Sequence, residues 1–369
     1  MGNLTSRKGP SLEVHGGDVW GVSRRLGAEP REIIDFSASV NPLGPSPHAL
    51  RAARDHMNVL SSYPDPDCTM LTEAIAAYHQ VPRGSILVGN GSTELIYLVA
   101  RSFGERTLIP IPSFSDYERS VRTAGGRCRF FNSGSPAAFR VDPRELARSL
   151  RGLDTLLLLG NPNNPTGQRH SPESLKDLLT EAARRGVRMA LDEAFIDYWE
   201  EDSLVREAAR SRHLIVFRTF TKFFALAGLR VGYLVAHPES VAVLRRLKEP
   251  WSVNTLAQAA AQASLLDQDY ILESRAYMER TRFKFLGELQ AKKGLTVFPS
   301  EANYVLLRLS PPRSVPKLAR GLLERRVLIR EAGSFRGLGP QYVRLAVKSS
   351  AQNRLLLESL GALLRHEAV

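Results

Sequence analysis

The chain of 369 residues is 43% apolar and carries a formal net charge of +12. This length predicts a large buried core in more than one domain. The basic residues are scattered through helical patterns rather than gathered in one tract, which argues against a nucleic-acid partner. No apolar run is long enough to span a membrane, and the start lacks a signal-peptide core. The two cysteines, Cys68 and Cys128, form neither a metal-binding spacing nor a disulfide framework, so we expect a cytoplasmic protein without a metal site.

Alternating strand-like and helix-like patterns run through the middle of the chain. They predict an α/β fold in which a mostly parallel sheet is flanked by helices. We expect a large domain over residues 46–252. A smaller α/β domain is expected to consist of an N-terminal arm, residues 1–45, and residues 253–369. The boundary between the two domains is expected within 248–254, just before a long alanine-rich helical stretch.

A glycine turn at residues 89–94, GNGSTE, follows the strand-like run 85–88 and leads into an apolar helix pattern. Such a turn presents free backbone N–H groups and the positive end of the helix dipole, which together bind a phosphate. Alone, the turn is weak evidence for a phosphate site.

The loop NPNNPTG at residues 161–167 lies between the apolar run 156–160 and a helix-like stretch. Its two prolines restrict the preceding residues to extended geometry, which fixes the direction of the Asn164 side chain. An ordinary Asn/Pro turn is the alternative interpretation. Further on, residues 187–195 predict a short buried strand that ends in the Asp192 carboxylate, for which a helix cap is the alternative.

An amine, two hydroxyls and a guanidinium follow within twelve residues, 219–230. The run 214–217 predicts a buried strand, so the amine of Lys222 is expected near a strand's carboxyl end, where open α/β sheets bind ligands. A neutral lysine amine can condense with an aldehyde, and Arg230 can grip a phosphate that the hydroxyls of Thr219 and Thr221 also reach. This set suits pyridoxal phosphate (PLP), although a solvated surface would also explain the lysine and arginine alone.

The spacing of these segments supports one site. Asn164 precedes Asp192 by twenty-eight residues, Asp192 precedes Lys222 by thirty, and each gap fits one strand plus one crossover helix. The ordered set NPNNPTG, LDEAF and TFTKFFALAGLRVGY resembles the fold-type I PLP enzymes, in the class I/II aminotransferase group, over nearly all of the chain. The resemblance implies that Lys222 forms the Schiff base with PLP. It also implies that Asp192 keeps the proton on the pyridine nitrogen and that Asn164 donates to the phenolic oxygen.

The same resemblance implies the remaining cofactor contacts. The phosphate ligands it implies are Arg230, Thr219, Thr221, Gly91, Ser92 and Thr93. Phe114 matches an aromatic residue that stacks on the pyridine ring, and Tyr63 matches a tyrosine that reaches the cofactor phosphate of the neighbouring subunit, which implies a homodimer. For each aromatic residue, a core side chain is the alternative.

Two C-terminal arginines match family residues that bind a small phosphorylated amino acid. Arg330 and Arg344 lie fourteen residues apart and match residues that bind the substrate's phosphate and α-carboxylate, respectively. A planar guanidinium suits both anions, although surface arginines are common in so basic a chain. Asn41, Asn303 and, near the phosphate, His15 complete the predicted substrate set.

Two subfamilies compete for the reaction, the L-threonine-O-3-phosphate decarboxylases and the histidinol-phosphate aminotransferases. HGGD at 15–18, DFS at 35–37 and NPLG at 41–44 resemble the decarboxylases. The aminotransferases typically have Asn-Glu-Asn-Pro where this chain has SVNP at 39–42, and many have a tyrosine at the position of Phe195. We therefore predict decarboxylation of L-threonine O-3-phosphate to (R)-1-amino-2-propanol O-2-phosphate and CO2 for the cobalamin side chain. The alternative is transamination between histidinol phosphate and 2-oxoglutarate, with glutamate as product, in histidine biosynthesis.

Overall fold

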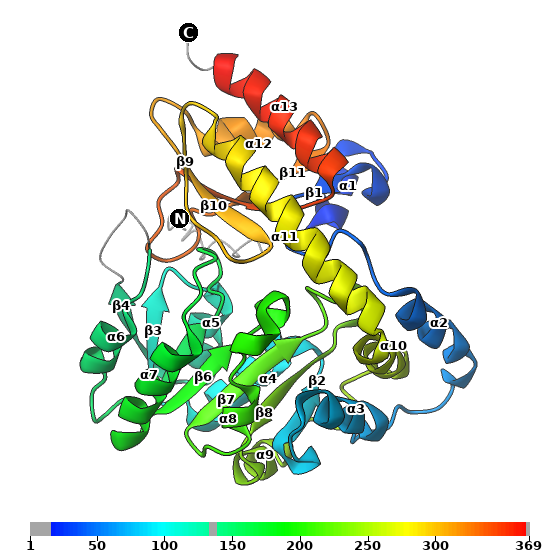
Figure 1. Cartoon of the computed structure of the whole chain (residues 1–369), viewed down its shortest axis with the longest axis vertical. Helices are drawn as coiled ribbons and strands as arrows, with labels where there is room; N and C mark the ends of the chain where they lie inside the picture. Colours follow the sequence, from blue (N-terminus) through cyan, green and yellow to red (C-terminus); the bar gives the residue numbers. More distant parts are fainter. Residues whose placement is uncertain (1–15, 133–138, 367–369) are drawn as a thin grey trace, which may run out of the picture.

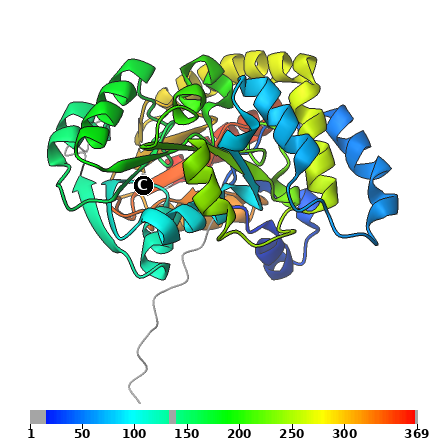
Figure 2. The ribbon, with the colours of Figure 1, turned by 90° about the horizontal axis from the view of Figure 1, so that it is seen from below.

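Seven strands form the central sheet of the larger part of the molecule, and helices cover both of its faces (Figures 1 and 2). The computed structural model describes residues 16–132 and 139–366. The strands are β2 (Ile86–Gly89), β3 (Arg106–Ile111), β4 (Arg127–Asn132), β5 (Leu156–Gly160), β6 (Arg188–Asp192), β7 (Leu214–Thr219) and β8 (Gly232–Ala236). The helices are α2 (Pro47–Asp55), α3 (Thr69–His79), α4 (Gly91–Phe103), α5 (Ser115–Thr123), α6 (Pro143–Ser149), α7 (Pro172–Arg184), α8 (Val205–Ala208), α9 (Pro238–Arg245) and α10 (Thr255–Leu266).

The strand order is β2-β8-β7-β6-β5-β3-β4, and β8 alone is antiparallel to its neighbours. The predicted α/β fold is confirmed, with a mixed sheet. The exception has a physical reason. A parallel connection needs a crossover of a dozen or more residues, usually a helix. Residues 220–231 between β7 and β8 contain only the single 3₁₀ turn η5 (Ala227–Leu229), so the chain returns in the opposite direction.

Each central strand is buried on both faces, as a sheet covered by two helix layers requires. In β5, Leu157 and Leu159 pack on the side of α3, α7 and α10, whereas Leu156 and Leu158 pack on the side of α4, α5 and α9. This explains why the apolar runs in the sequence are continuous rather than alternating. The carboxyl ends of β2, β3, β5, β6 and β7 all meet at one edge of the sheet, which faces the smaller domain (Figure 1).

The smaller domain is built on an antiparallel sheet of order β12-β13-β10-β9. Its strands are β9 (Leu295–Val297), β10 (Tyr304–Leu309), β12 (Arg330–Glu331) and β13 (Tyr342–Ala346), and its helices are α11 (Gln268–Gln290), α12 (Val315–Leu323) and α13 (Ser350–His366). The N-terminal segment contains α1 (Val19–Leu26) and β1 (Ile34–Asp35), which pairs in parallel with β11 (Val327–Leu328). Short 3₁₀ helices are η1 (Pro30–Glu32), η2 (Met57–Val59), η3 (Arg83–Ser85) and η4 (Ile196–Asp202).

Apolar packing bears on where the two domains divide, for which the sequence pattern predicts residue 252. The sequence places the alanine-rich helix α10 in the small domain, but Ala257 and Ala261 of α10 lie in the same apolar core as α3 and the large sheet. The change of core falls within α11, because Ile271 packs in the large-domain core and Phe285 in the small-domain core. Small alanine side chains let α10 approach its neighbours closely, which pattern alone does not assign to a domain. We therefore propose that the domains divide within α11.

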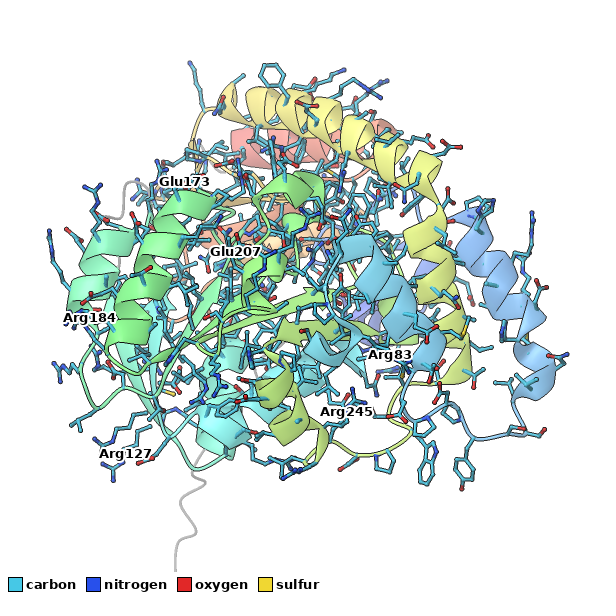
Figure 3. The ribbon with its side chains drawn as sticks, turned by 60° about the horizontal axis from the view of Figure 1, so that its bottom comes forward. Arg83, Arg127, Glu173, Arg184, Glu207 and Arg245 are labelled. Carbon is cyan, nitrogen blue, oxygen red and sulfur yellow. The ribbon has the colours of Figure 1, made fainter. Side chains whose placement is uncertain are left out.

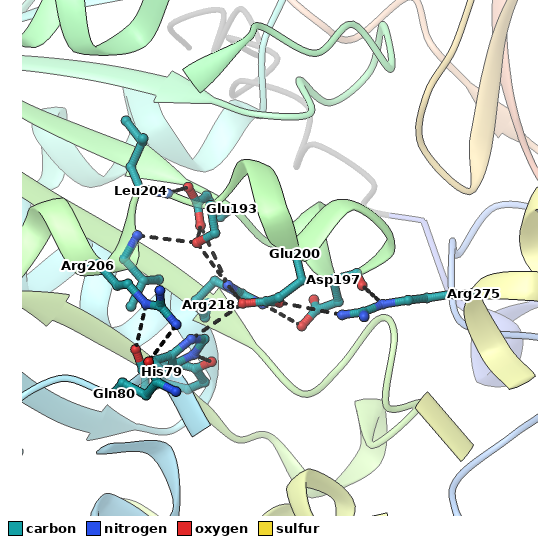
Figure 4. A network of polar contacts seen from close by, with 12 residues as sticks. His79, Gln80, Glu193, Asp197, Glu200, Leu204, Arg206, Arg218 and Arg275 are labelled. Carbon is teal, nitrogen blue, oxygen red and sulfur yellow. Dashed lines mark hydrogen bonds and ion pairs between the residues drawn. The ribbon is translucent and has the colours of Figure 1, made fainter. Parts of the chain in front are cut away.

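A buried ionic network holds β7 against the segment that follows β6 (Figure 4). The guanidinium of Arg218, only 1% exposed, donates to Asp197 over 2.7 Å and to Glu200 over 2.6 Å, and lies 3.6 Å from Glu193. Arg275 of α11 donates to the backbone oxygen of Asp197 over 2.8 Å. Since Glu193 directly follows Asp192 and Arg218 directly precedes Thr219, the network fixes the exits of two strands relative to each other.

Charged side chains on the outside come from many elements (Figure 3). The labelled Arg83, Arg184 and Arg245 belong to η3, α7 and α9, respectively. Within residues 16–132 and 139–366, no helix has both the length and the apolar character that crossing a membrane needs.

The network generates a stability prediction. Arg218→Met should lower the free energy of unfolding by about 3–5 kcal/mol, because it leaves buried carboxylates without their counter-charge. Arg83→Ala is the matched control, since its ion pair with Glu73 is half exposed on both sides and is worth about 1 kcal/mol or less. Urea unfolding of the two variants measures both values, and equal losses would contradict the analysis.

Candidate active site

The predicted residues on the large sheet come together at its carboxyl edge. Asp192 ends β6, the Asn164 loop follows β5, and Lys222 follows β7. Gly160 is paired in register with Asp192, and Asp192 with Phe217, so the three loops leave neighbouring strands side by side. Asn164, Asp192 and Lys222 therefore follow or end three neighbouring strands.

The Asp192 carboxylate is 7% exposed, and each of its two oxygens accepts one hydrogen bond. Its Oδ1 accepts from the backbone N–H of Ala194 over 3.0 Å, and its Oδ2 accepts from the hydroxyl of Tyr117 over 2.7 Å. Burial raises the pKa of Asp192, while the Tyr117 hydroxyl, the Ala194 N–H and the nearby Lys222 oppose that rise. A cationic ring nitrogen beside this carboxylate would stabilise its charged form.

The amine of Lys222 is prepared for reaction with an aldehyde. Burial, together with the positive charges of Arg344 and Arg230, lowers the pKa of Lys222 to about 8, against the opposing effect of Asp192. The Nζ atom lies 5.7 Å from the centroid of the Phe195 ring, which is an apolar neighbour. Because condensation requires the neutral amine, this environment raises the reactive fraction near neutral pH.

Arg344 of β13 reaches across from the small domain to the Asn164 loop. Its Nη1 donates to the side-chain oxygen of Asn164 over 2.5 Å, and its Nη2 donates to the backbone oxygen of Ser37 over 2.7 Å. The guanidinium lies over the Tyr304 ring at 5.1 Å, and burial lowers the pKa of Arg344 to about 10. The bond to Asn164 uses the amide oxygen, so the amide nitrogen that is predicted to donate to the cofactor is not consumed by it.

Arg330 lies directly opposite Arg344. The two residues are Cα partners in the β12–β13 pair, so their side chains share one face of the sheet. Both are buried, at 8% and 7% exposed, and Arg330 donates to the Ser334 hydroxyl over 2.9 Å. Like charges placed opposite each other are unfavourable, and an anionic ligand would offset that cost.

The start of α4 fits a phosphate. Gly91 has φ +75°, and a Cβ there would lie 2.7 Å from Nη2 of Arg230. On the other side, a Cβ at Gly232 would lie 2.6 Å from the backbone nitrogen of Ser92. The positive φ of Gly91 and the close backbone contact at Gly232 favour glycine at both positions, and they bring β8 and Arg230 close to the start of α4, which has no side-chain cap.

Four residues with side-chain hydroxyls lie at the same edge of the sheet. The buried Thr219 hydroxyl donates to that of Thr221 over 3.0 Å, and Ser92 and Thr93 lie in the first turn of α4. Hydroxyls, a guanidinium and free backbone N–H groups suit a dianionic phosphate, so the residues present fit PLP.

The contacts and burial of the other predicted residues differ. Phe114 begins α5 after β3 and packs edge-on against Tyr117, with ring centroids 5.6 Å apart. Tyr63 is 83% exposed and packs on Trp251 at 5.0 Å. Asn303 is fully buried and donates to the backbone oxygen of Ser39 over 3.0 Å. His15 lies outside the described residues.

Asn41 has a supporting position rather than an open one. Its amide nitrogen donates to the backbone oxygen of Phe223 and to the hydroxyls of Tyr270 and Ser274, at 2.9, 3.1 and 2.9 Å. Its backbone N–H donates to the backbone oxygen of Lys222 over 2.9 Å. These bonds attach the N-terminal arm to the loop that carries the amine.

Sequence reasoning missed Tyr117. Its position three residues after Phe114 was the available signal, since residues three apart at the start of a helix lie on the same side of it.

Comparison with known proteins agrees with the geometry. The model of the family "Aminotransferase class I and II" matches residues 31–360. The chain therefore belongs to this family of PLP-dependent enzymes, and the predicted family and cofactor are confirmed.

Relatives of two activities are similar to the chain. The threonine-phosphate decarboxylase of Salmonella typhimurium is 36% identical over 350 residues, which cover 94% of this chain and 95% of that protein. The histidinol-phosphate aminotransferase of Methanopyrus kandleri is 34% identical over 354 residues, 91% of this chain and 90% of that protein. The solved structure of L-threonine-O-3-phosphate decarboxylase from Porphyromonas gingivalis superposes with a TM-score of 0.81 at 29% identity, over 90% of this chain and all of that chain.

The phosphate cradle generates a prediction about Gly91. Gly91→Ala should weaken PLP binding by about tenfold or more, because the new Cβ meets Arg230 and the positive φ costs about 1–2 kcal/mol. Gly228→Ala is the matched control, since a Cβ there has no neighbour within 4 Å. Titration of each apoprotein with PLP measures the affinities, and unchanged binding by the Gly91 variant would count against the cradle.

Proposed function

We propose that the protein catalyses the PLP-dependent decarboxylation of L-threonine O-3-phosphate. The products are (R)-1-amino-2-propanol O-2-phosphate, which is used for the cobalamin side chain, and CO2. The observation that carries this proposal is the pairing of Arg330 with Arg344 on adjacent strands. L-Threonine O-3-phosphate has two anionic ends on one short molecule, and the two guanidiniums give each end a partner.

The chemistry depends on which bond of the α-carbon stands perpendicular to the plane of the cofactor. PLP, when bound, supplies an electron-withdrawing ring that accepts the electron pair released from the α-carbon. Arg330 would hold the phosphate and Arg344 the carboxylate, so together they set the torsion about the α-carbon. With the carboxylate perpendicular, the bond from the α-carbon to the carboxyl carbon breaks and CO2 leaves.

The rest of the reaction needs a proton for the α-carbon and a ring nitrogen that stays protonated. A proton must replace the carboxylate on the α-carbon, and the Nζ atom of Lys222 is the candidate donor at that position. Asp192 would keep the ring nitrogen protonated, and Asn164 would donate to the phenolic oxygen. Arg230, Thr219, Thr221 and the first turn of α4 would hold the cofactor phosphate.

Transamination of histidinol phosphate is the second candidate. The similarity to the Methanopyrus kandleri aminotransferase favours it, because the identity of 34% is close to that of the decarboxylase relative. In this reaction the hydrogen of the α-carbon would stand perpendicular and Lys222 would remove it. Phe195, which offers no hydroxyl to the cofactor, favours the decarboxylase.

We also propose a homodimer in which Tyr63 serves the neighbouring subunit. The ring of Tyr63 is exposed and packs on Trp251, and further exposed apolar side chains, Met57, Leu60 and Leu247, belong to the same connecting segments. An exposed apolar surface of this kind is typical of a protein interface. Tyr63 lies in the segment between η2 and α3, and not in one of the loops that follow β5, β6 and β7.

A cytoplasmic location is the proposal that suits these features. Cys68 and Cys128 are both free thiols, and burial raises the pKa of Cys68 to about 12, which keeps it unreactive.

The reaction is tested with two substrates. We expect CO2 from L-threonine O-3-phosphate without any 2-oxoglutarate, and no glutamate from histidinol phosphate with 2-oxoglutarate. Arg330→Met should lower kcat/KM for L-threonine O-3-phosphate by about 100-fold, because charge-assisted hydrogen bonds are lost. Arg308→Met, on β10 of the same small sheet, is the control and should have little effect. Glutamate formation without CO2 would reject the decarboxylase.

The dimer is tested by subunit mixing. Tyr63→Phe should lower PLP affinity by about tenfold, because it removes a phosphate hydrogen bond and keeps the ring on Trp251. Mixing it with Lys222→Ala should restore tight binding and turnover at sites that combine the intact residues of both chains. Light scattering measures the mass of each sample. A monomer, or no recovery on mixing, would refute the arrangement.

A further inference from the structure

The hydroxyl of Tyr117 is directed at the carboxylate on which the ring nitrogen of PLP depends. Tyr117 is 2% exposed, lies in α5, and donates to Oδ2 of Asp192 over 2.7 Å. The other carboxylate oxygen accepts from the backbone N–H of Ala194 over 3.0 Å. With one donor on each oxygen, the plane of the carboxylate is fixed from two sides.

The position of the hydroxyl is itself fixed by packing. The Tyr117 ring stands at 89° to the Phe114 ring, and it belongs to the same apolar core as side chains of β3 and β5. Gly160 of β5, the register partner of Asp192, leaves room for the hydroxyl, since a Cβ there would lie 3.1 Å from Oη of Tyr117. Burial raises the pKa of Tyr117 well above its usual value, so the hydroxyl keeps its proton and remains a donor.

The charge of Asp192 needs such a donor. Burial alone favours the neutral carboxyl, whereas a hydrogen bond to the carboxylate favours the charged form. A neutral carboxyl would not hold a proton on the ring nitrogen, and the ring would then accept electrons poorly.

We propose that Tyr117 is a positioning residue that acts through Asp192: its hydroxyl orients the carboxylate and keeps it charged against the ring nitrogen of PLP. The inference rests on PLP binding, which is part of the proposed function, and is independent of the choice between decarboxylation and transamination.

The test is Tyr117→Phe, which keeps the ring and removes the hydroxyl. We expect PLP to bind about tenfold more weakly to the apoprotein, because a hydrogen bond to a charged group is lost. With PLP labelled with ¹⁵N in the ring, the nitrogen resonance of the variant should move from the pyridinium position towards that of neutral pyridine. The kcat should fall by about tenfold or more, and KM should change little.

Tyr233→Phe is the matched control. Tyr233 of β8 is also 2% exposed, and its hydroxyl forms one 2.7 Å hydrogen bond, to His79, away from Asp192. Loss of the Tyr233 hydroxyl should leave PLP affinity and the ring ¹⁵N resonance unchanged, even if Tyr233→Phe and Tyr117→Phe lower the thermal midpoint equally.

Gly160→Ala provides a second, independent variant. Its Cβ should displace the Tyr117 hydroxyl without removing it, so we expect an ¹⁵N shift in the same direction as in Tyr117→Phe and smaller in size. An ¹⁵N resonance of Tyr117→Phe that matches the wild type, or an equal shift in Tyr233→Phe, would overturn the proposal. Absence of turnover with L-threonine O-3-phosphate would refute the proposed reaction, while the affinity and the ¹⁵N resonance would still decide the role of Tyr117.

Discussion

Parallel pairing of β5, β6 and β7 is the constraint on which the site depends. Backbone hydrogen bonding holds neighbouring strands about 4.8 Å apart, and the register aligns Gly160, Asp192 and Phe217. The loops that carry Asn164 and Lys222 therefore start beside Asp192 whatever their own sequences. The Arg218 network reinforces this alignment, because it connects β7 to Asp197 and Glu200 in the segment that follows Asp192. Catalytic spacing is thus a property of the sheet.

Burial disfavours the charged form of three ionisable groups of the site. It raises the pKa of Asp192 and lowers those of Lys222 and Arg344, so each group is pushed towards its neutral form. PLP and a phosphorylated amino acid carry the complementary charges. A ring cation would face Asp192, and the substrate's anions would face Arg344 and Arg330. In the apoprotein these charges are buried without full compensation. Ligand binding would supply the opposite charges, and this reduction of the burial cost would add to the affinity that the direct contacts give.

The sequence predicts the parts of the site that local signals define. Asp192 and Lys222 follow apolar strand runs, and Gly91 lies in a glycine turn, so strand ends and turns were sufficient to place them. Other features arise from tertiary packing. The alanine-rich pattern of α10 does not say which core it joins, and nothing local makes Asn41 a support for the Lys222 loop. Tyr117 resembles any buried helix residue until Asp192 appears beside it. The direction of β8 follows from the connection between β7 and β8, which contains only the 3₁₀ turn η5 and is too short for a crossover helix.

The unbroken course of α11 through both cores has a mechanical consequence. A single helix transmits displacement along its length as a rigid rod, so any tilt of the small domain must also move the first turns of α11. There, Tyr270 and Ser274 hold Asn41, and the backbone of Asn41 holds the carbonyl of Lys222. A ligand that binds Arg330 and Arg344 and tilts the small domain would therefore also displace the hydrogen bonds that hold the backbone of Lys222.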